Sequence, residues 1–338
     1  MRKSTIKIVI LGLLFSPTWL FAYSEASEIT IGASATAGAT LRDEKSVKRK
    51  QKLLVTPKWL ESKIKSEKNL AIIDLAFRKT NYETGHIPGA FYLDWRTDII
   101  DSENSHLYRL PKKEKMEKLL SRLGITPETM VVLTDNMANR SAVRMFYTLK
   151  YFGHDRVRIL DGGTNVWKDS DRKLTAEIPK AKPTKYEIKE AREEYIVRLE
   201  AVEKAIDKDP QLIDGRPNSQ FTGEKPGKAF HTNTAHKRKG HVPSAANIPW
   251  KDNLNEDGTF KSIPELRDLY ESNGISLDRE IITYCNEGLH AAMPWFIIRE
   301  LFGNTEVQLY DDSMVEWANR DDTQLKIEAG EKKTDVKN

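Results

Sequence analysis

Cysteine is almost absent from this chain, because Cys285 is the only one among 338 residues. A single cysteine cannot form a disulfide within the chain. It is either a partner in an intermolecular bond or a free reactive thiol. The alternative for any lone cysteine is an inert, buried small hydrophobe. We therefore use the sequence around Cys285 to distinguish between these roles.

A large charge excess and the common ligand-binding motifs are also missing. The formal net charge of +4 is small for this length, and no zinc-knuckle spacing or aromatic–basic platform occurs, so we expect no nucleic-acid partner. No glycine-rich phosphate loop, nucleotide fingerprint or metal-ligand cluster occurs either, so we expect no cofactor and no metal. Hydrophobic residues make up 39% of the chain, which is enough to form cores, and a mean hydropathy of -0.58 is typical of a soluble protein.

The one long apolar run lies close to the N-terminus. Basic residues precede an apolar run at 8–21, and small residues follow, with cleavage expected after Ala22 or Ala26. This order is typical of a secretory signal. The run is shorter than the ~20 residues that span a membrane. We therefore predict an exported protein, periplasmic or secreted, which would be membrane-anchored if the signal stays uncleaved.

Cys285 lies between a predicted strand and a predicted helix. The β-prone run Ile281–Tyr284 precedes it, a loop with Gly288 near its middle follows, and an apolar helical pattern runs from 293 to 301. Such a loop turns several backbone N–H groups into one small bowl, and the helix dipole adds partial positive charge there. We expect this thiol to ionise more easily than a free cysteine, and the thiolate is the reactive form. The setting favours a nucleophile.

The sequence contains an internal duplication. Residues 134–153 match residues 284–303 without a gap, at a constant offset of 150, so Asp135 stands where the second half has its cysteine. The pair Ile73–Asp74 recurs at Ile213–Asp214 with an offset of 140, and the motif at 85–90 recurs at 240–245 with an offset of 155. A repeat of this length indicates two similar globular domains. The change of offset predicts an extra loop in the second half, within residues 223–239.

Each half alternates strands and helices, which predicts an α/β fold with a mainly parallel sheet flanked by helices. Ligands bind beyond the C-terminal ends of such strands, where Cys285 falls. The first domain has an aspartate there, so we expect it to be catalytically silent and to form a wall of the cleft. The expected segments are a signal peptide (1–26), a flexible leader (27–52), the silent domain (53–176), a linker (177–190), the catalytic domain (191–325) and a charged tail (326–338).

Several motifs occur in the same order in both halves. They are Gly85–Ala90, Gly240–Ala245, Leu160–Gly163 with Trp167, Asp214–Arg216 with Phe221–Gly223, and the loop Cys285–Ala291. Taken together, these motifs resemble a tandem-domain rhodanese, a sulfurtransferase of the thiosulfate and 3-mercaptopyruvate type. The resemblance covers about residues 53–320 and implies two rhodanese-like domains.

The resemblance also implies a ping-pong reaction between a small-molecule sulfur donor and a thiophilic acceptor such as cyanide or a thiol. Cys285 would carry the sulfur as a persulfide, stabilised by the N–H groups of its loop. Arg216 matches the family arginine that holds the donor's sulfonate or carboxylate. Its alternative role is a structural salt bridge with Asp214. The substrate-binding loop residues implied are Asn286, Glu287, Gly288, Leu289, His290 and Ala291. We expect a monomer.

The loop departs from the familiar family sequences at Asn286 and Glu287. Thiosulfate-preferring enzymes typically carry two basic residues there, and mercaptopyruvate-preferring enzymes carry small ones. An acid so close to the nucleophile should oppose thiolate formation and disfavour a dianionic donor, although a protonated His290 would offset it. We predict thiosulfate as the donor and keep 3-mercaptopyruvate as the alternative.

Two other interpretations follow from the same strand–loop–helix pattern. Cysteine phosphatases need an arginine after five intervening residues, but Ala291 occupies that position and the next arginine is Arg299. The second interpretation is a non-enzymatic persulfide carrier or redox partner. Rapid turnover with small donors would distinguish an enzyme from such a carrier.

Overall fold

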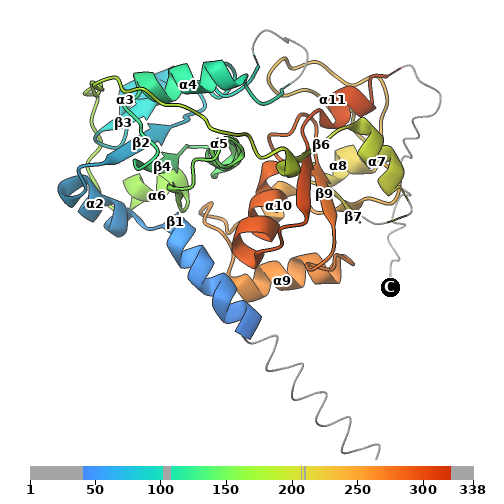
Figure 1. Ribbon diagram of the computed structural model, residues 1–338. Helices are drawn as coiled ribbons and strands as arrows, with labels where there is room; N and C mark the ends of the chain where they lie inside the picture. Colours follow the sequence, from blue (N-terminus) through green and yellow to red (C-terminus); the bar gives the residue numbers. More distant parts are fainter. Residues whose placement is uncertain (1–40, 102–107, 207, 209–210, 321–338) are drawn as a thin grey trace, which may run out of the picture. The chain divides into compact units, whose positions relative to one another are not determined.

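A computed structural model describes residues 41–101, 108–206, 208 and 211–320 (Figure 1). The chain divides into two compact units, residues 1–44 and 45–338, and both predicted domains fall within the second unit. The predicted signal peptide and charged tail lie outside the described residues. Each helix within the described ranges is too short or too polar to span a bilayer.

The end of the expected flexible leader is helical. Residues 41–53 form a helix that runs into the first strand. Lys50 Nζ donates hydrogen bonds to the carbonyls of Phe260 (2.8 Å) and Lys261 (2.6 Å), and Arg49 Nη1 donates to the carbonyl of Phe302 (3.0 Å). The prediction of a flexible segment up to residue 52 is therefore wrong for this part, because basic side chains of the charged run bind backbone carbonyls of the second domain.

The first domain is a parallel five-stranded sheet with the strand order β1-β5-β4-β2-β3. Its central strands are almost continuously apolar, as expected for strands buried on both faces. The strands are β1 (Leu54–Val55), β2 (Leu70–Asp74), β3 (Ala90–Tyr92), β4 (Met130–Thr134) and β5 (Val157–Leu160). The helices are α2 (Pro57–Ser66), α3 (Lys79–Thr84), α4 (Lys113–Arg122), α5 (Arg140–Tyr151) and α6 (Gly163–Asp169).

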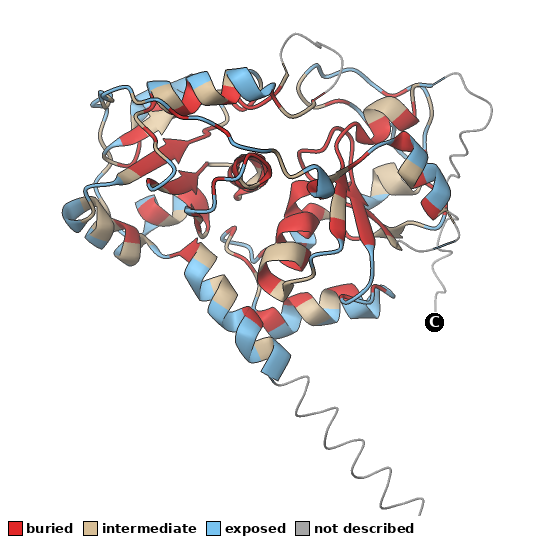
Figure 2. Cartoon of the chain, viewed as in Figure 1, coloured by how far each residue is buried: buried red, intermediate tan, exposed pale blue. Residues whose placement is uncertain are grey.

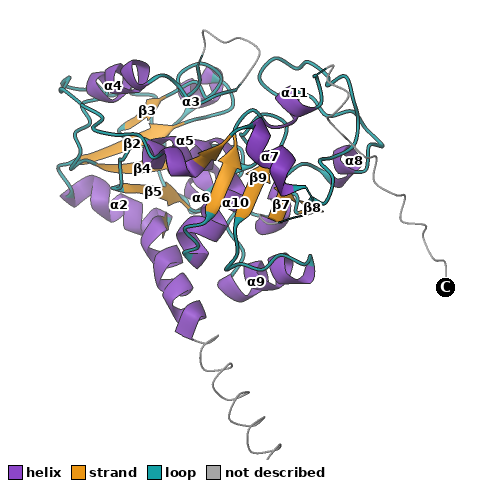
Figure 3. Cartoon of the chain, turned by 45° about the vertical axis from the view of Figure 1, so that its right-hand side comes forward, coloured by secondary structure: helices purple, strands orange, loops and turns teal. Residues whose placement is uncertain are grey.

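The second domain repeats this topology, with the order β6-β10-β9-β7-β8. Its strands β9, β7 and β8 are labelled in Figure 3. The two matching parallel sheets confirm the predicted fold class and the duplication. The strands are β6 (Ile196–Val197), β7 (Gln211–Asp214), β8 (Ala246–Asn247), β9 (Ile281–Tyr284) and β10 (Val307–Tyr310). The helical segments are η1 (Glu193–Tyr195), α7 (Leu199–Ala205), α8 (Asn218–Phe221), η2 (Trp250–Asn253), α9 (Ile263–Ser272), α10 (Ala292–Phe296), η3 (Ile297–Phe302) and α11 (Ser313–Trp317).

The segment between the domains is extended, and residues 176–192 contain neither helix nor strand. This segment is hydrogen-bonded to residues of α4. The N–H groups of Thr184 and Tyr186 donate to the carbonyl and hydroxyl oxygens of Ser121, each at 2.9 Å. Ile188 N–H donates to Glu117 Oε1 at 2.8 Å. The predicted linker is therefore fastened to the first domain.

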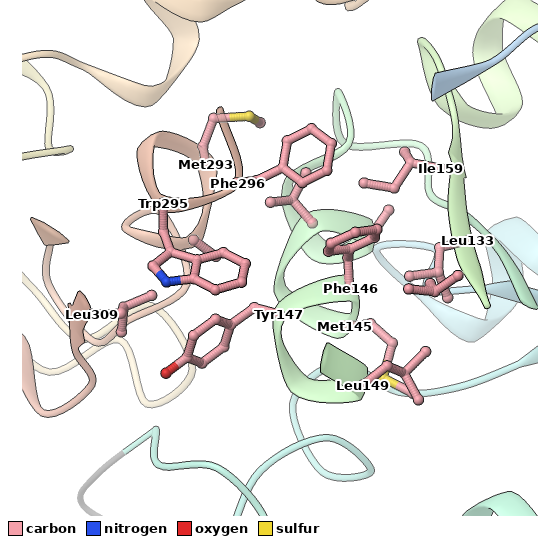
Figure 4. Packing of buried hydrophobic residues seen from close by; sticks show 14 of the residues in the cluster. Leu133, Met145, Phe146, Tyr147, Leu149, Ile159, Met293, Trp295, Phe296 and Leu309 are labelled. Carbon is pink, nitrogen blue, oxygen red and sulfur yellow. The ribbon is translucent and has the colours of Figure 1, made fainter. Parts of the chain in front are cut away.

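The two domains share one apolar core, in which α5 packs against α10. The ring of Phe146 meets that of Phe296 edge to face at 4.9 Å, and Tyr147 meets Trp295 at 4.8 Å (Figure 4). Phe146 and Phe296 are equivalent positions of the duplication. Figure 2 shows that the central strands and α5 are almost entirely buried. This core holds the start of α10, and thus the loop before it, against the first domain.

Candidate functional site

Cys285 directly follows β9, at the C-terminal edge of the second sheet, as predicted. Its side chain is buried, with 1% exposure. Its backbone N–H donates to Ser313 Oγ at 3.1 Å, and its carbonyl accepts from the N–H of Met314 at 3.1 Å. The start of α11 therefore fixes the backbone of the cysteine.

The thiol lies among backbone N–H groups, but its environment does not favour ionisation. Burial raises the pKa of Cys285 above its ordinary value, while the backbone N–H groups of Glu287 and Ala291 act in the opposite direction. The Glu287 carboxylate raises the pKa further, and the N–H of His290 lowers it. The prediction of an easily ionised thiol is therefore wrong, because it counted the N–H groups of the loop and not its burial.

Gly288 allows the loop to curl around the sulfur. Its φ of +81° lies in the left-handed region, where side chains are strained. A Cβ added there would lie 2.5 Å from Asp311 Oδ1 and 3.0 Å from Arg144 Nη1. Asp311 and Arg144 form a fully buried ion pair at 2.6 Å between the domains. The loop can approach this pair closely only because residue 288 lacks a side chain.

The equivalent loop of the first domain shows what such a bowl binds. Asp135 is buried, and its Oδ1 accepts hydrogen bonds from the N–H groups of Met137 (2.8 Å) and Asn139 (2.9 Å). Its Oδ2 accepts from the N–H groups of Ser141 (2.8 Å) and Ala142 (3.0 Å). Four backbone donors thus surround one carboxylate. In this duplicated fold, the loop therefore offers several backbone N–H donors to a negatively charged side chain, while burial raises the pKa of Asp135 above its ordinary value.

Arg216 lies in the structural salt bridge that was the alternative to donor binding. Its Nε lies 3.0 Å from each carboxylate oxygen of Asp214, and its Nη2 lies 2.6 Å from Asp214 Oδ2. Nη2 also donates to the carbonyl of Gly240 at 2.7 Å, and the side chain is 1% exposed. The charge of Arg216 is therefore already balanced by a buried carboxylate.

The extra loop of the second half covers the site. We call residues 223–239 the cover loop; this segment lies in the long connection between α8 and β8 and confirms the predicted insertion. Glu287 binds its middle: Oε2 accepts from the N–H of Phe230 (2.9 Å), and Oε1 accepts from the N–H of His231 (3.2 Å). His231 Nδ1 lies 2.6 Å from Glu287 Oε2. Glu287, the second residue after Cys285, thus anchors the cover loop.

Asn286 binds the same loop near its end. Its Oδ1 lies 3.1 Å from His236 Nε2, and its Nδ2 donates to Gln220 Oε1 at 2.9 Å. Burial lowers the pKa of His236 to about 4, so this imidazole is neutral at physiological pH and Nε2 can donate to the amide oxygen. Both unusual side chains after Cys285 therefore face the cover loop.

His290 is a neutral imidazole in the wall of the site. Its ring stacks on Trp250 at 5.1 Å, and its Nε2 lies 3.5 Å from Arg140 Nη1. Burial, and then the charges of Arg140 and Lys251, hold the pKa of His290 well below its usual range. His290 is therefore neutral at physiological pH and does not offset the charge of Glu287.

The remaining loop residues serve the core or the backbone. Leu289 is 2% exposed and belongs to the shared apolar core. Ala291 is fully buried, and its carbonyl accepts from Thr283 Oγ1 at 3.1 Å. Among the residues that the structure describes, no group of three or more His, Cys, Asp or Glu side chains could hold a metal.

Arg140 and the two tryptophans near it lie in the site, although the sequence analysis did not predict them there. Arg140 begins α5 of the first domain, and its guanidinium lies 5.6 Å from the Trp250 ring and 6.0 Å from the Trp95 ring. The duplication contained a signal, because Trp95 and Trp250 are related by the same offset of 155 as the repeated motif before them. The sequence contained no sign that they enclose a cation from the first domain.

Comparison with known proteins identifies the family. The model of the rhodanese-like domain matches the chain twice, at residues 56–170 and 199–320. The chain belongs to the rhodanese-like family. It is a tandem-domain member of the sulfurtransferases in that family, which confirms the resemblance seen in the motifs. In the solved structures, the chain is similar to Tum1 from Saccharomyces cerevisiae, with a TM-score of 0.70, 21% identity, and coverage of 82% of this chain and 98% of that one.

Two curated relatives carry different names. A protein of Haloferax volcanii called "Putative thiosulfate sulfurtransferase" is 35% identical over 271 residues, which is 79% of this chain and 93% of the relative. A protein of Thermus thermophilus called "Sulfur carrier protein TtuD" is 36% identical over 272 residues, or 79% of this chain and 94% of the relative. The anaerobic ergothioneine biosynthesis enzyme from Chlorobium limicola shares the fold, with a TM-score of 0.72, 24% identity, and coverage of 82% and 70%.

Proposed function

We propose that this sulfurtransferase moves the sulfane sulfur of thiosulfate to a thiophilic acceptor through a persulfide on Cys285. The observation that carries the proposal is the position of Cys285 in a loop whose backbone N–H groups face its sulfur and favour the anionic form of the thiol. The first domain supports it, because the same loop there surrounds the Asp135 carboxylate with four N–H donors. A thiolate or persulfide anion would occupy the equivalent place in the second domain.

The reaction has two steps. The Cys285 thiolate attacks the outer sulfur of thiosulfate, a bond forms between the two sulfur atoms, and the S–S bond of the donor breaks so that sulfite leaves with the electron pair. Cyanide or a thiolate then attacks the outer sulfur of the persulfide and forms thiocyanate or a new persulfide. The Cys285 thiolate is the leaving group of this second step, which returns the enzyme to its starting state.

Related functions differ in the donor or in the source of the sulfur. 3-Mercaptopyruvate would supply the sulfur through the same nucleophile. A persulfide carrier would receive it from a protein, and the relative named as a sulfur carrier, together with the burial of Cys285 beneath the cover loop, favours this as the second candidate. We propose that the mature protein works as an exported monomer, on the basis of the N-terminal sequence pattern and of a site built within one chain.

Thiocyanate formation from cyanide tests the proposal. The mature protein is assayed with thiosulfate and with 3-mercaptopyruvate, beside the Cys285→Ser variant. We expect turnover with thiosulfate and its loss in the variant. Faster turnover with 3-mercaptopyruvate would show that this compound, and not thiosulfate, is the preferred donor. Turnover that survives in Cys285→Ser would show that Cys285 is not the nucleophile. Absence of turnover with both donors would contradict the enzymatic function and favour the persulfide carrier.

A further inference from the structure

The donor needs a positive charge near Cys285, and Arg216 does not provide a free one. Thiosulfate and 3-mercaptopyruvate are both anions at neutral pH, and the loop around Cys285 carries the acid Glu287 instead of basic residues. Arg216 is bound on two sides by Asp214 and is almost fully buried. The proposed reaction therefore requires another cation to bind the anionic group of the donor.

Arg140 is a cation that no carboxylate contacts in the described part of the chain, although the negative charges of Asp135 and Glu287 act on it from a distance. Its Nη2 donates to the Met137 thioether at 2.9 Å, its Nη1 lies 3.5 Å from the neutral His290 Nε2, and its buried Nε has no hydrogen-bond partner. Within the described part of the chain, no Asp or Glu forms an ion pair with it. Thioethers are weak acceptors, so the guanidinium retains most of its capacity to bind an anion.

Aromatic rings from three separate segments enclose the guanidinium. Its central carbon lies 4.4 Å from the ring of Phe230 in the cover loop, 5.6 Å from Trp250 and 6.0 Å from Trp95. Such rings stabilise a cation by cation–π attraction and leave its hydrogen-bond donors for a ligand. Arg140 is partly buried, and the attraction between a guanidinium and a bound anion is stronger away from bulk water.

His290 connects this enclosure to the nucleophile. Its backbone N–H acts on the Cys285 sulfur, and its side chain reaches Arg140. One residue therefore spans the space between the reacting sulfur and the guanidinium. Thiosulfate likewise has its reactive sulfur and its sulfonate oxygens at opposite ends.

We propose that Arg140, supplied by the otherwise silent first domain, binds the anionic group of the sulfur donor while its outer sulfur faces Cys285. The proposal rests on the proposed function. It gives the first domain a role in donor recognition, and it explains how a site with an acid beside the nucleophile accepts an anion.

Thiosulfate binding to the unreactive Cys285→Ser protein tests the proposal by isothermal titration calorimetry. The second change is Arg140→Gln or Arg140→Lys. Arg158→Gln is the matched control, because Arg158 is also a first-domain arginine that stacks on an indole, that of Trp59 at 4.6 Å. We expect Arg140→Gln to weaken binding by about tenfold or more, the effect of losing a hydrogen bond to a charged group. Arg140→Lys should recover part of the affinity, and Arg158→Gln should change it by less than about twofold.

Steady-state kinetics with Cys285 intact separate binding from chemistry. We expect Arg140→Gln to raise KM for thiosulfate by about tenfold or more and to change kcat by less than about threefold. A rise in KM for 3-mercaptopyruvate alone would keep Arg140 as the anion site and identify the ligand group as a carboxylate.

Unchanged affinity and KM in Arg140→Gln, with normal turnover, would overturn the role of Arg140 and leave the proposed function intact. Thiosulfate binding that depends on Arg140, in a protein that shows no turnover, would support the role of Arg140 and contradict the proposed function. Equal losses in Arg140→Gln and Arg158→Gln would show that the aromatic stacking of the arginines is structural, and would also overturn the proposal.

Discussion

Nδ1 of His231 lies 2.6 Å from Oε2 of Glu287, so the second residue after the nucleophile is bonded to the cover loop. The same carboxylate accepts the backbone N–H groups of Phe230 and His231. Glu287 is 1% exposed and faces this loop rather than open solvent. Glu287 would repel an anionic donor if it were free in the cleft. Instead, its carboxylate holds the cover loop over the site.

Glu287→Ala should loosen the cover loop. The variant leaves two backbone N–H groups and an imidazole without their charged acceptor, and each such bond is worth about 1.5–3 kcal/mol. We expect hydrogen exchange of the Phe230 and His231 amides to accelerate by at least about tenfold, measured by mass spectrometry of peptides. Glu271→Ala, which removes an exposed partner of Arg267 on α9, serves as the control. Unchanged protection of the cover loop would show that Glu287 does not hold it.

Gly288→Ala should be far more harmful than an alanine at another glycine of the same conformation. Gly274 has a φ of +80°, close to that of Gly288, but an added Cβ there would meet nothing within 4 Å. We expect Gly274→Ala to cost about 1 kcal/mol of unfolding free energy, the strain of the left-handed conformation. Gly288→Ala must also displace the Asp311 carboxylate, so it should cost at least twice as much and abolish turnover. Equal losses in urea unfolding would refute the close packing of the loop.

Asp74→Asn should stabilise the protein at alkaline pH. Burial, and then the nearby charge of Asp135, raise the pKa of Asp74 from 3.8 to about 7. The folded state therefore binds more protons than the unfolded state between these values, and stability falls as the pH rises through this window. The penalty is complete above about pH 7 and absent below about pH 4. We expect Asp74→Asn to raise Tm by several degrees at about pH 8 and by little at about pH 4.

The equivalent residue of the second domain provides the control for that experiment. Asp214 is paired with Arg216, so Asp214→Asn leaves a buried guanidinium without its partner. Breaking a buried pair in this way costs about 3–5 kcal/mol. Asp214→Asn should therefore lower Tm at about pH 8, where Asp74→Asn raises it. A loss of stability in Asp74→Asn at that pH would contradict the account of the first domain.

Persulfide formation should accelerate with pH well beyond neutrality. The thiolate is the nucleophile, and burial raises the pKa of Cys285, so the reactive fraction continues to increase above about pH 8.5. Single-turnover reactions with thiosulfate, quenched and followed by intact mass, report this step alone. We expect the rate to rise about tenfold per pH unit on its acidic limb. A plateau already reached near pH 7 would show that the N–H groups outweigh burial.

The sequence predicted the fold well because the fold follows from local patterns. Apolar runs such as Met130–Thr134 and Ile281–Tyr284 indicate buried strands, and the constant offset between the halves indicates that each half forms its own sheet. Cys285 was predictable for the same reason, since its position depends only on the strand before it and the loop and helix that follow.

The electrostatics of the site could not be predicted, because they depend on contacts across the sequence. Arg216 is two residues from its partner Asp214, but sequence alone cannot show that its side chain turns back instead of reaching the cleft. Arg140 reaches His290 from the other domain, 150 positions away. The role of Glu287 depends on where the inserted cover loop lies, and insertions carry no repeat partner from which their position could be inferred.

The persulfide on Cys285 is tested most simply by the intact mass of the protein after incubation with thiosulfate, compared with that of Cys285→Ser. We expect a gain of one sulfur atom on the unaltered protein, its disappearance when cyanide is added, and no gain on the variant. A mass that stays unchanged after thiosulfate, or a gain that persists in Cys285→Ser, would contradict the persulfide on Cys285.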